Sequence, residues 1–325
     1  MNRFVITALV VTLVAFCQQV TAQRSGGGLG KFTKSKRYIS VGLTANAINY
    51  FGDIVPKNRA GSFDTDFTRP NVGFFVQKRL WPRITIRMGG AWGVLSGEDH
   101  TTSDPDDFEH GGAFRYKRNL HFRNRIYDLT TVAVVDIIQN RGLAERRPDS
   151  PIPYLLAGVG AFYHNPQALR PEGFEGSEWV DLRPLRTENQ ERPYSEIEIS
   201  FPVGLGVRYR LSESWDIAFE ISYRFTLTDY LDDVSGDYID LGEFDSDLAR
   251  ALHDRSAEPV ALLSGEVRSP ETISYNSAVD GRPYEVVNGY GMPNNRRGAP
   301  DNDIFIVTGF QISYIFNKRG FYKFR

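Results

Sequence analysis

The feature that most constrains the fold is a pair of long alternating segments in residues 196–228. Apolar and polar side chains alternate along 196–211 and again along 215–228, and the short polar segment Ser212-Glu213-Ser214 joins the two runs. A period of two residues predicts β-strands, and a polar link of this length predicts a hairpin. One face of each strand is almost wholly apolar. The hairpin therefore requires a large apolar medium to face, such as a lipid bilayer.

Six further segments carry the same alternation, which gives eight strands in all. They lie at about 39–47, 71–77, 84–94, 120–138, 155–164 and 304–316. The alternation in 120–138 loses its phase near Tyr127, and we expect a β-bulge there. Lipid offers no partner for unpaired backbone groups, so strands that cross a membrane must close into a barrel. We predict an all-β fold: an eight-stranded antiparallel transmembrane β-barrel over residues 38–317.

The connections between these strands alternate in length. Two are tight (80–83 and 212–214), one is moderate (139–152), and four are long (51–69, 96–118, 165–194 and 229–302). Short turns on one rim and long loops on the other are typical of outer-membrane barrels, whose termini lie on the periplasmic side. The last loop, 229–302, is too long to be a simple connection, and two interpretations remain open: a cap packed over the barrel mouth, or a binding surface.

The N-terminus indicates export. A short basic start, an apolar run over 4–16 and the small residues Val20-Thr21-Ala22 predict a signal peptide at 1–22. The single cysteine, Cys17, lies within it, so the mature chain has no thiol for disulfides, metal sites or catalysis. Residues 23–37 are expected to form a Gly-rich, basic periplasmic tail, and 318–325 a second tail. The net charge of −2 gives no case for a nucleic-acid partner.

A soluble barrel with its apolar face turned inward would show the same alternation. Glycines distinguish the two, because they lie on the polar face, where a narrow lumen needs small residues beside Arg and Glu. These are Gly42, Gly73, Gly89, Gly93, Gly158, Gly160, Gly204 and Gly206. Aromatic residues near the strand ends also suit interfacial girdles, namely Tyr50, Trp81, Trp215, Tyr314 and Phe316. We therefore place the apolar face against lipid, with the protein in the cell outer membrane.

Charged residues of both signs lie on the predicted lumenal face. They are Arg87, Glu196, Glu198, Arg208, Arg210, Asp216, Glu220 and Arg224. Eight strands leave room only for side chains, so we predict a packed ion-pair network rather than a channel. A proton or ion path is the less favoured alternative.

Two other groups of residues were weighed as chemical sites. The acidic segment 229–237 offers Asp232, Asp233, Ser235 and Asp237 as oxygen ligands for calcium, but the spacing is irregular and a plain acidic turn is favoured. Five histidines, His100, His110, His121, His164 and His253, are scattered without a nucleophile signature. We therefore predict no enzymatic activity, no resident metal and no cofactor.

Short motifs in the strands and loops resemble one known family. They are the segments 49–53, 69–73, 118–123, 153–166, 185–190 and 229–236, together with Arg297-Gly298 and Asp301. In order and spacing they are similar to the Bacteroidota outer-membrane barrel family that includes PorG of the type IX secretion system. The resemblance covers nearly all of the mature chain. One departure is Asn189, where the family pattern has Gly; Asn tolerates a left-handed backbone, so the turn is expected to survive.

The resemblance implies a barrel that docks the periplasmic ring of the secretion machine, built from a lipoprotein and its partner, against the outer membrane. Basic residues expected at the periplasmic rim are the candidates for that contact: Lys34, Lys36, Arg37, Arg141, Arg146 and Arg147. For the residues of 31–37, a solvated tail that tethers the first strand is the favoured interpretation, and a basic contact with acidic head groups or a periplasmic partner is the other. The alternative function is a surface-exposed barrel that binds a ligand or host protein through its long outer loops.

Overall fold

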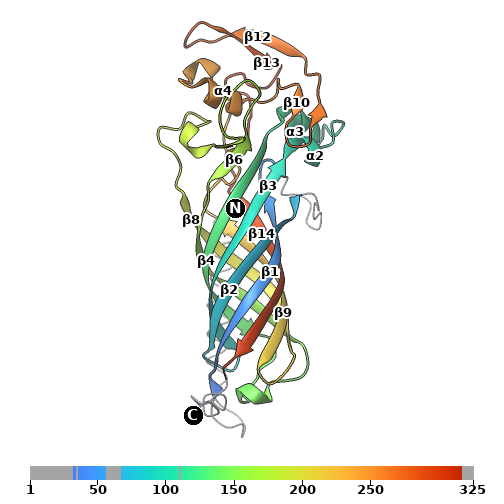
Figure 1. The fold of residues 1–325 in the computed structure, drawn as a ribbon, viewed down its shortest axis with the longest axis vertical. Coiled ribbons are helices and arrows are strands. Elements are labelled where there is room, and N and C mark those ends of the chain that lie inside the picture. The colour runs from blue at the N-terminus through green and yellow to red at the C-terminus, as the bar shows by residue number, and fades with distance from the viewer. Residues whose placement is uncertain (1–31, 34–35, 56–66, 110, 317–325) are drawn as a thin grey trace.

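The computed structural model describes residues 32–33, 36–55, 67–109 and 111–316. Eight long strands form an antiparallel barrel (Figure 1). They are β1 (Ile39–Phe51), β2 (Arg69–Arg79), β3 (Ile84–Glu98), β4 (His121–Asp136), β5 (Ile152–Tyr163), β8 (Ile197–Arg210), β9 (Trp215–Thr226) and β14 (Ile304–Ile315). The predicted signal peptide, most of the Gly-rich tail and the C-terminal tail lie outside the described residues.

The barrel is closed because every strand pairs on both sides. Strands that follow each other along the barrel wall pair in turn, β3 also pairs with β4, and β1 pairs with β14 from Ser40↔Ile315 to Phe51↔Ile304. No barrel edge is therefore left with unpaired backbone groups, which is what a lipid environment requires. The predicted eight-stranded antiparallel barrel is confirmed.

The bulge expected near Tyr127 is wrong. The β3–β4 register runs without interruption from Ile84↔Val135 to Glu98↔His121. The side chains of β4 keep alternating, but Phe122, Ile126 and Val132 point inward, where they join apolar clusters inside the barrel. The polarity of the inward face changes along β4, while the direction of its side chains does not.

One seam of the barrel is interrupted. Pairing between β5 and β8 runs from Ile152↔Arg208 to Ala157↔Val203 and resumes at Gly160↔Ser200. The gap contains Pro202, which has no backbone N–H to donate to a ladder. The other side of the same strand keeps its partner, since Pro202 pairs with Arg224 of β9.

Short turns close one end of the barrel, and folded loops cover the other (Figure 1). The turn end contains the 3-10 helix η3 (Ala144–Arg146) within 137–151. The loop end holds α2 (Asp99–Thr102), α3 (Gly112–Arg118), β6 (Pro166–Leu169), β7 (Trp179–Asp181), η4 (Arg183–Leu185), η5 (Leu241–Glu243), α4 (Asp247–His253), β10 (Val260–Ala261), β11 (Glu266–Val267), β12 (Thr272–Asn276) and β13 (Pro283–Val287). We call this assembly of loops the cap.

The cap is built mainly from the last long loop. Leu241, Phe244 and Val286 form an apolar cluster in it, and the β12–β13 hairpin pairs from Thr272↔Val287 to Asn276↔Pro283. Asn189 has a φ of 50°, so the left-handed turn expected at this departure from the family pattern is present. The last loop therefore has a core of its own, as the cap interpretation predicts.

Candidate functional site: the lumen and its two ends

The outward face of the barrel carries a belt of exposed apolar side chains. Leu43, Phe74, Leu129 and Ile197 are each between 63% and 65% exposed. Isolated apolar residues are common on protein surfaces, but a continuous belt around a whole barrel needs a lipid environment. Its inward face holds the ion pairs described below, which is the reverse of a soluble barrel.

The protein is an outer-membrane β-barrel. At the turn end the girdle predicted from sequence includes Trp215, which contacts Tyr314 edge-to-face at 5.2 Å between ring centroids. The girdle role expected for Tyr50 is wrong, because its ring is 2% exposed and points into the barrel. No helix in the described part of the chain is long and apolar enough to cross a membrane.

Ion pairs fill the middle of the lumen. Arg87 of β3 reaches across the barrel to Glu220 of β9 at 2.7 Å, and the Tyr154 hydroxyl donates to the same carboxylate at 2.9 Å. Arg224 pairs with Asp128 at 3.3 Å. These contacts join strands on opposite walls, so the charges act as internal struts rather than as the lining of a pore.

Aromatic rings pack around these struts where glycines leave space. The Phe75 ring lies beneath the Arg87 guanidinium, 5.2 Å from its centre, and occupies the position that a side chain at Gly42 would need. Gly206 makes the same allowance for the Tyr154 ring. The glycines were predicted to leave room for Arg and Glu; at these two positions the room is taken by aromatic rings, which pack against Arg87 and Arg208.

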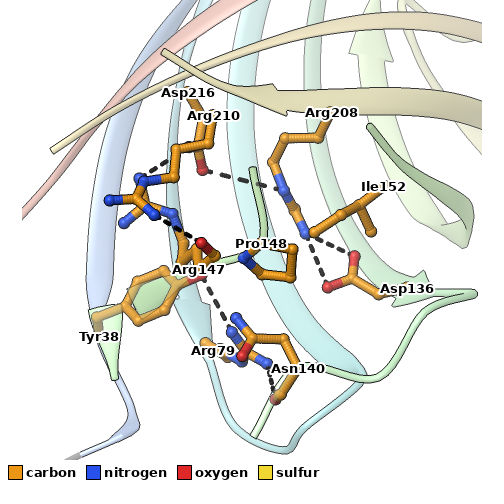
Figure 2. Close-up of a pocket in the computed structure, with 10 residues that line it drawn as sticks. All are labelled: Tyr38, Arg79, Asp136, Asn140, Arg147, Pro148, Ile152, Arg208, Arg210 and Asp216. Atoms are coloured by element: carbon orange, nitrogen blue, oxygen red, sulfur yellow. Dashed lines mark hydrogen bonds and ion pairs between the residues drawn. The ribbon is translucent and has the colours of Figure 1, made fainter. Parts of the chain in front are cut away.

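A second ionic layer, which we call the floor, closes the turn end (Figure 2). Arg208 binds both carboxylate oxygens of Asp136 at 2.7 Å, and Arg147 binds Asp216 at 2.9 Å. Arg147 also donates to the main-chain carbonyls of Ser212 and Glu213. A single arginine therefore ties the turn 137–151 to the turn between β8 and β9.

The structure brings five of the eight predicted lumenal charges into these two layers: Arg87, Arg208, Asp216, Glu220 and Arg224. Arg210 instead lies at the rim, where it pairs with the exposed Asp149 at 2.8 Å. Glu196 lies at the loop end and pairs with Arg183 at 3.0 Å. Glu198 points inward on β8 and is half-buried, but it belongs to neither layer.

Sequence reasoning missed two of the acids that complete the network. Asp128 and Asp136 both belong to β4, the strand to which a bulge was assigned. The expected bulge left the facing of residues 120–138 unassigned, so neither acid was placed in the lumen. Their signal was present in the sequence, because an aspartate at a lipid-facing position would be costly.

The basic residues predicted to contact a periplasmic partner separate into different environments. Lys34 lies outside the described residues. Arg37 and Arg146 are exposed, and Lys36 and Arg141 are half-buried. Arg147 is 5% exposed and is consumed by the floor, so its assignment to a partner contact is wrong. Arg146 is therefore the exposed basic side chain of the 137–151 turn.

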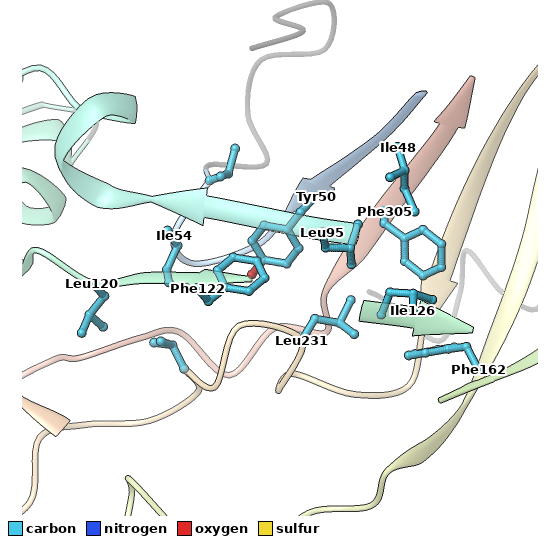
Figure 3. Packing of buried hydrophobic residues seen from close by; sticks show 12 residues of the cluster. Ile48, Tyr50, Ile54, Leu95, Leu120, Phe122, Ile126, Phe162, Leu231 and Phe305 are labelled. Atoms are coloured by element: carbon cyan, nitrogen blue, oxygen red, sulfur yellow. The ribbon is translucent and has the colours of Figure 1, made fainter. Parts of the chain in front are cut away.

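Apolar packing closes the loop end of the lumen (Figure 3). Phe122 and Leu95 are fully buried there, and the Tyr50 ring meets Phe122 edge-to-face with 4.8 Å between ring centroids. Leu231, from the start of the last loop, packs into the same cluster. We call this cluster, together with the buried polar residues next to it, the roof; those residues are Asp99, Arg118, Asp232, Asp233, His253, Arg297 and Asp303.

Two buried arginines bind the cap to the roof. Arg118 forms a two-point ion pair with Asp99, at 2.7 and 2.8 Å, and donates to the carbonyls of Asp53 and Arg297. Arg297 binds Glu188 at 2.6 Å and the carbonyl of Asp233 at 2.9 Å. The two guanidiniums link loops that leave four different strands.

The acidic segment proposed as a weak calcium site does not form one in the described structure. Asp232 accepts hydrogen bonds from Tyr50 and Ile54, whereas Asp233 accepts from Thr187 and Tyr194. The two carboxylates thus bind different parts of the protein and do not point toward one shared site. Burial raises the pKa of Asp233 to about 7, partly opposed by Arg297, so this group favours its protonated form more than an ordinary aspartate does.

The histidines have structural environments rather than a shared site. His253 accepts from the Ile239 amide through Nε2, and its Nδ1 contacts the Thr187 carbonyl, which fits a neutral ring. Burial, with the nearby Arg297, lowers the pKa of His253 well below its usual value. His121 accepts from the Leu169 amide, His100 contacts Glu266, and His164 is buried beside Tyr194. His110 lies outside the described residues.

No family model matches this chain, and a search of curated proteins finds no match. Among solved structures, it is similar to neisserial surface protein A, with 9% identity, a TM-score of 0.35 and coverage of 87% of this chain and 98% of that one. It is also similar to OprG from Pseudomonas aeruginosa, with 11% identity, a TM-score of 0.35 and coverage of 87% of this chain and 97% of OprG. For Ail, the attachment invasion locus protein of Yersinia pestis, the identity is 10%, the TM-score is 0.33, and coverage is 87% of this chain and 100% of Ail.

Proposed function

We propose that this protein is a non-enzymatic, non-conducting outer-membrane anchor for the periplasmic ring of the type IX secretion system. The observation that carries the proposal is the floor. Arg147 donates to the main-chain carbonyls of Ser212 and Glu213 in the neighbouring turn, and Arg210 donates to those of Arg147 and Glu145 within the 137–151 turn. The largest periplasmic turn is therefore a fixed platform and not a loose connection.

The filled lumen supports the same role. Buried ion pairs cross the middle of the barrel, the floor closes one end, and the roof closes the other. A barrel blocked at three levels is suited to holding a partner at the membrane and poorly suited to passing a solute. The family resemblance of the loop motifs adds the identity of the partner, a ring lipoprotein and its companion protein.

Copurification from the native host tests the anchor. The tagged protein, solubilised mildly, is expected to bring the ring lipoprotein with it, and Arg146→Glu should reduce that yield at least about tenfold, because the reversed charge faces the partner without disturbing the floor. Arg192→Glu, a reversal at an exposed arginine of the cap side, is the matched control and should leave the yield unchanged. Absence of ring proteins from the wild-type preparation would refute the anchor.

A second function is favoured by the cap. The β12–β13 hairpin lies at the far end of the molecule from the floor (Figure 1), and it and its neighbouring turn expose Ile273 and Val279. Exposed apolar side chains on an ordered surface suit recognition of a ligand or host protein. If the cap binds a ligand or host protein, replacing both residues by Ser should abolish that binding and leave ring copurification intact. If the protein is only an anchor, the same variant should change neither ring copurification nor binding at the cell surface.

A further inference from the structure

The Tyr50 hydroxyl lies between two buried carboxyl groups in the roof. It is 2.6 Å from Asp232 Oδ2 and 2.8 Å from Asp303 Oδ1. Tyr50 belongs to β1, Asp232 to the start of the last loop, and Asp303 to its end, immediately before β14. The three side chains are at most 2% exposed. This contact therefore joins both ends of the last loop to the barrel wall.

The two contacts need two protons, but two ionised carboxylates and one phenol hydroxyl supply only one. A phenol has one proton and can donate to only one acceptor. Its oxygen also accepts from the Asp53 amide at 3.2 Å. The second carboxyl contact is a hydrogen bond only if that carboxyl is protonated and donates to the phenol oxygen. One proton is then held between Asp232 and Asp303.

The remaining partners of both carboxyls are main-chain amides, from the last loop and from the loop after β1. Asp232 accepts from the amides of Ile54 and Val234, and Asp303 accepts from the amide of Leu231 at 2.9 Å. Gly52 permits the close approach, because a side chain there would collide with the Tyr50 hydroxyl and with Asp303. The backbone is thus arranged to hold these three groups together.

The charged surroundings favour retention of the proton. The groups that face the pair are Asp53 after β1, Asp229 after β9 and Arg118 at the end of α3. Arg118 is already bound at two points by Asp99. Burial, reinforced by these neighbouring carboxylates, raises the pKa of both members of the pair, that of Asp232 to about 8.

We propose that one proton shared by Asp232 and Asp303 through the Tyr50 hydroxyl latches the extracellular cap onto the barrel, so that alkaline pH releases it. Loss of the proton leaves two negative charges in a dry site around one donor. Because the folded-state pKa is raised, the latch is fully present below the unfolded value of about 4 and is lost as pH rises through about 8. The latch acts on the outer side and does not depend on the proposed anchor function.

Limited proteolysis of the full-length protein in outer-membrane vesicles tests the latch. Cleavage within 229–302 is measured from pH 5 to 9 and divided by cleavage of an unfolded substrate at each pH. On the alkaline side of this profile, the wild-type rate should rise by up to about tenfold per pH unit for each proton released. In Asp303→Asn, the rise should be smaller by one proton, because an amide donates to Tyr50 without titrating. The residual rise belongs to other buried carboxyls of the cap whose pKa values are raised, Asp233 and Asp254 among them.

Asp245→Asn is the control, since Asp245 is an exposed carboxylate of the same loop, and its profile should match the wild type. Identical pH slopes in the wild type and Asp303→Asn, or a flat wild-type profile, would overturn the latch. Should Asp303→Asn fail to fold, infrared spectroscopy of the wild type decides. The carbonyl stretch of a protonated carboxyl should be present at neutral pH and disappear by about pH 9; its absence at neutral pH would refute the proposal.

Discussion

The two ends of this barrel are closed by different physical means. The floor is ionic: Arg208 and Arg147 bind Asp136 and Asp216 within the lumen, next to the turns. The roof combines an apolar cluster around Phe122 with buried arginines, a neutral histidine and carboxyls that favour protonation. We therefore expect the stability of the floor to depend on its ion pairs, and the stability of the roof to depend also on pH, through the protonation of its histidine and carboxyl groups.

The largest effect is expected where the roof holds a fully desolvated charge. Arg118→Ala leaves Asp99, which is 0% exposed, without its two-point partner. Removing one member of a buried pair costs about 3–5 kcal/mol. Proteolysis of the cap at pH 7 measures this loss, with Arg192→Ala as the exposed control. A cap equally resistant in both variants would show that the roof does not depend on this ion pair.

Removing the corresponding arginine of the floor should cost less and open nothing. Arg147→Ala leaves Asp216 within 4.0 Å of Arg208, so a partner remains and the expected loss is about 1–3 kcal/mol. Urea unfolding in lipid vesicles measures it. Planar-bilayer recordings should show no conductance, because the middle layer and the roof still block the lumen. A conducting Arg147→Ala barrel would mean that the floor alone is the barrier.

Acid should weaken the roof through His253. Its folded-state pKa is lowered, so its contribution is present above the unfolded value of about 6.5 and is lost as pH falls below it, by at most about 1.4 kcal/mol per pH unit. In His253→Asn the side-chain amide can still donate to the Thr187 carbonyl, but it does not titrate. The increase in cap proteolysis expected below about pH 6.5, the acid branch of the profile, should therefore be smaller in this variant. An unchanged acid branch would assign it to another group.

The smallest effect separates a rim pair from a lumenal pair on the same strand. Arg210 pairs with Asp149, whose side chain is 87% exposed, while Arg208 pairs with Asp136, whose side chain is 3% exposed. Asp149→Ala should change the free energy of unfolding by less than about 0.5 kcal/mol. Asp136→Ala, measured in the same vesicles, should cost several times more. Equal costs would mean that solvent reaches the floor.

Much of this contrast could be anticipated from the sequence, because alternation reports which face meets lipid. The hairpin of β8 and β9 and the lumenal Arg87 and Glu220 follow from that rule alone. It fails where the inward face becomes apolar, as along β4, and where a strand continues above the bilayer, as at Tyr50. The inward neighbours of β4 include strand residues such as Tyr154 and Ala218, and those of Tyr50 include the loop residues Asp232 and Asp303. In both places only the fold shows which residues these are.

Arg147 shows a second limit of sequence reasoning. A turn rich in arginine predicts a basic surface, but the direction of each side chain depends on the carbonyls that the neighbouring turn presents. The same limit applies to the cap. Glu188, Asp233 and Arg297 are far apart in sequence, and only the fold brings them together. Acidic spacing within 229–237 therefore could not reveal that its carboxylates serve separate partners.

Because β1 pairs with β14, the barrel could be cut at another turn and its present ends joined without losing a strand pair. Ser40 lies opposite Ile315, so the two ends of the described barrel meet at the floor. Apart from this closing pair, every barrel strand pairs with the barrel strand that precedes or follows it along the chain. A circular permutant that links the present ends and begins between β2 and β3 would retain every strand pair. Its assembly rate would then report whether closing the β1–β14 seam limits folding.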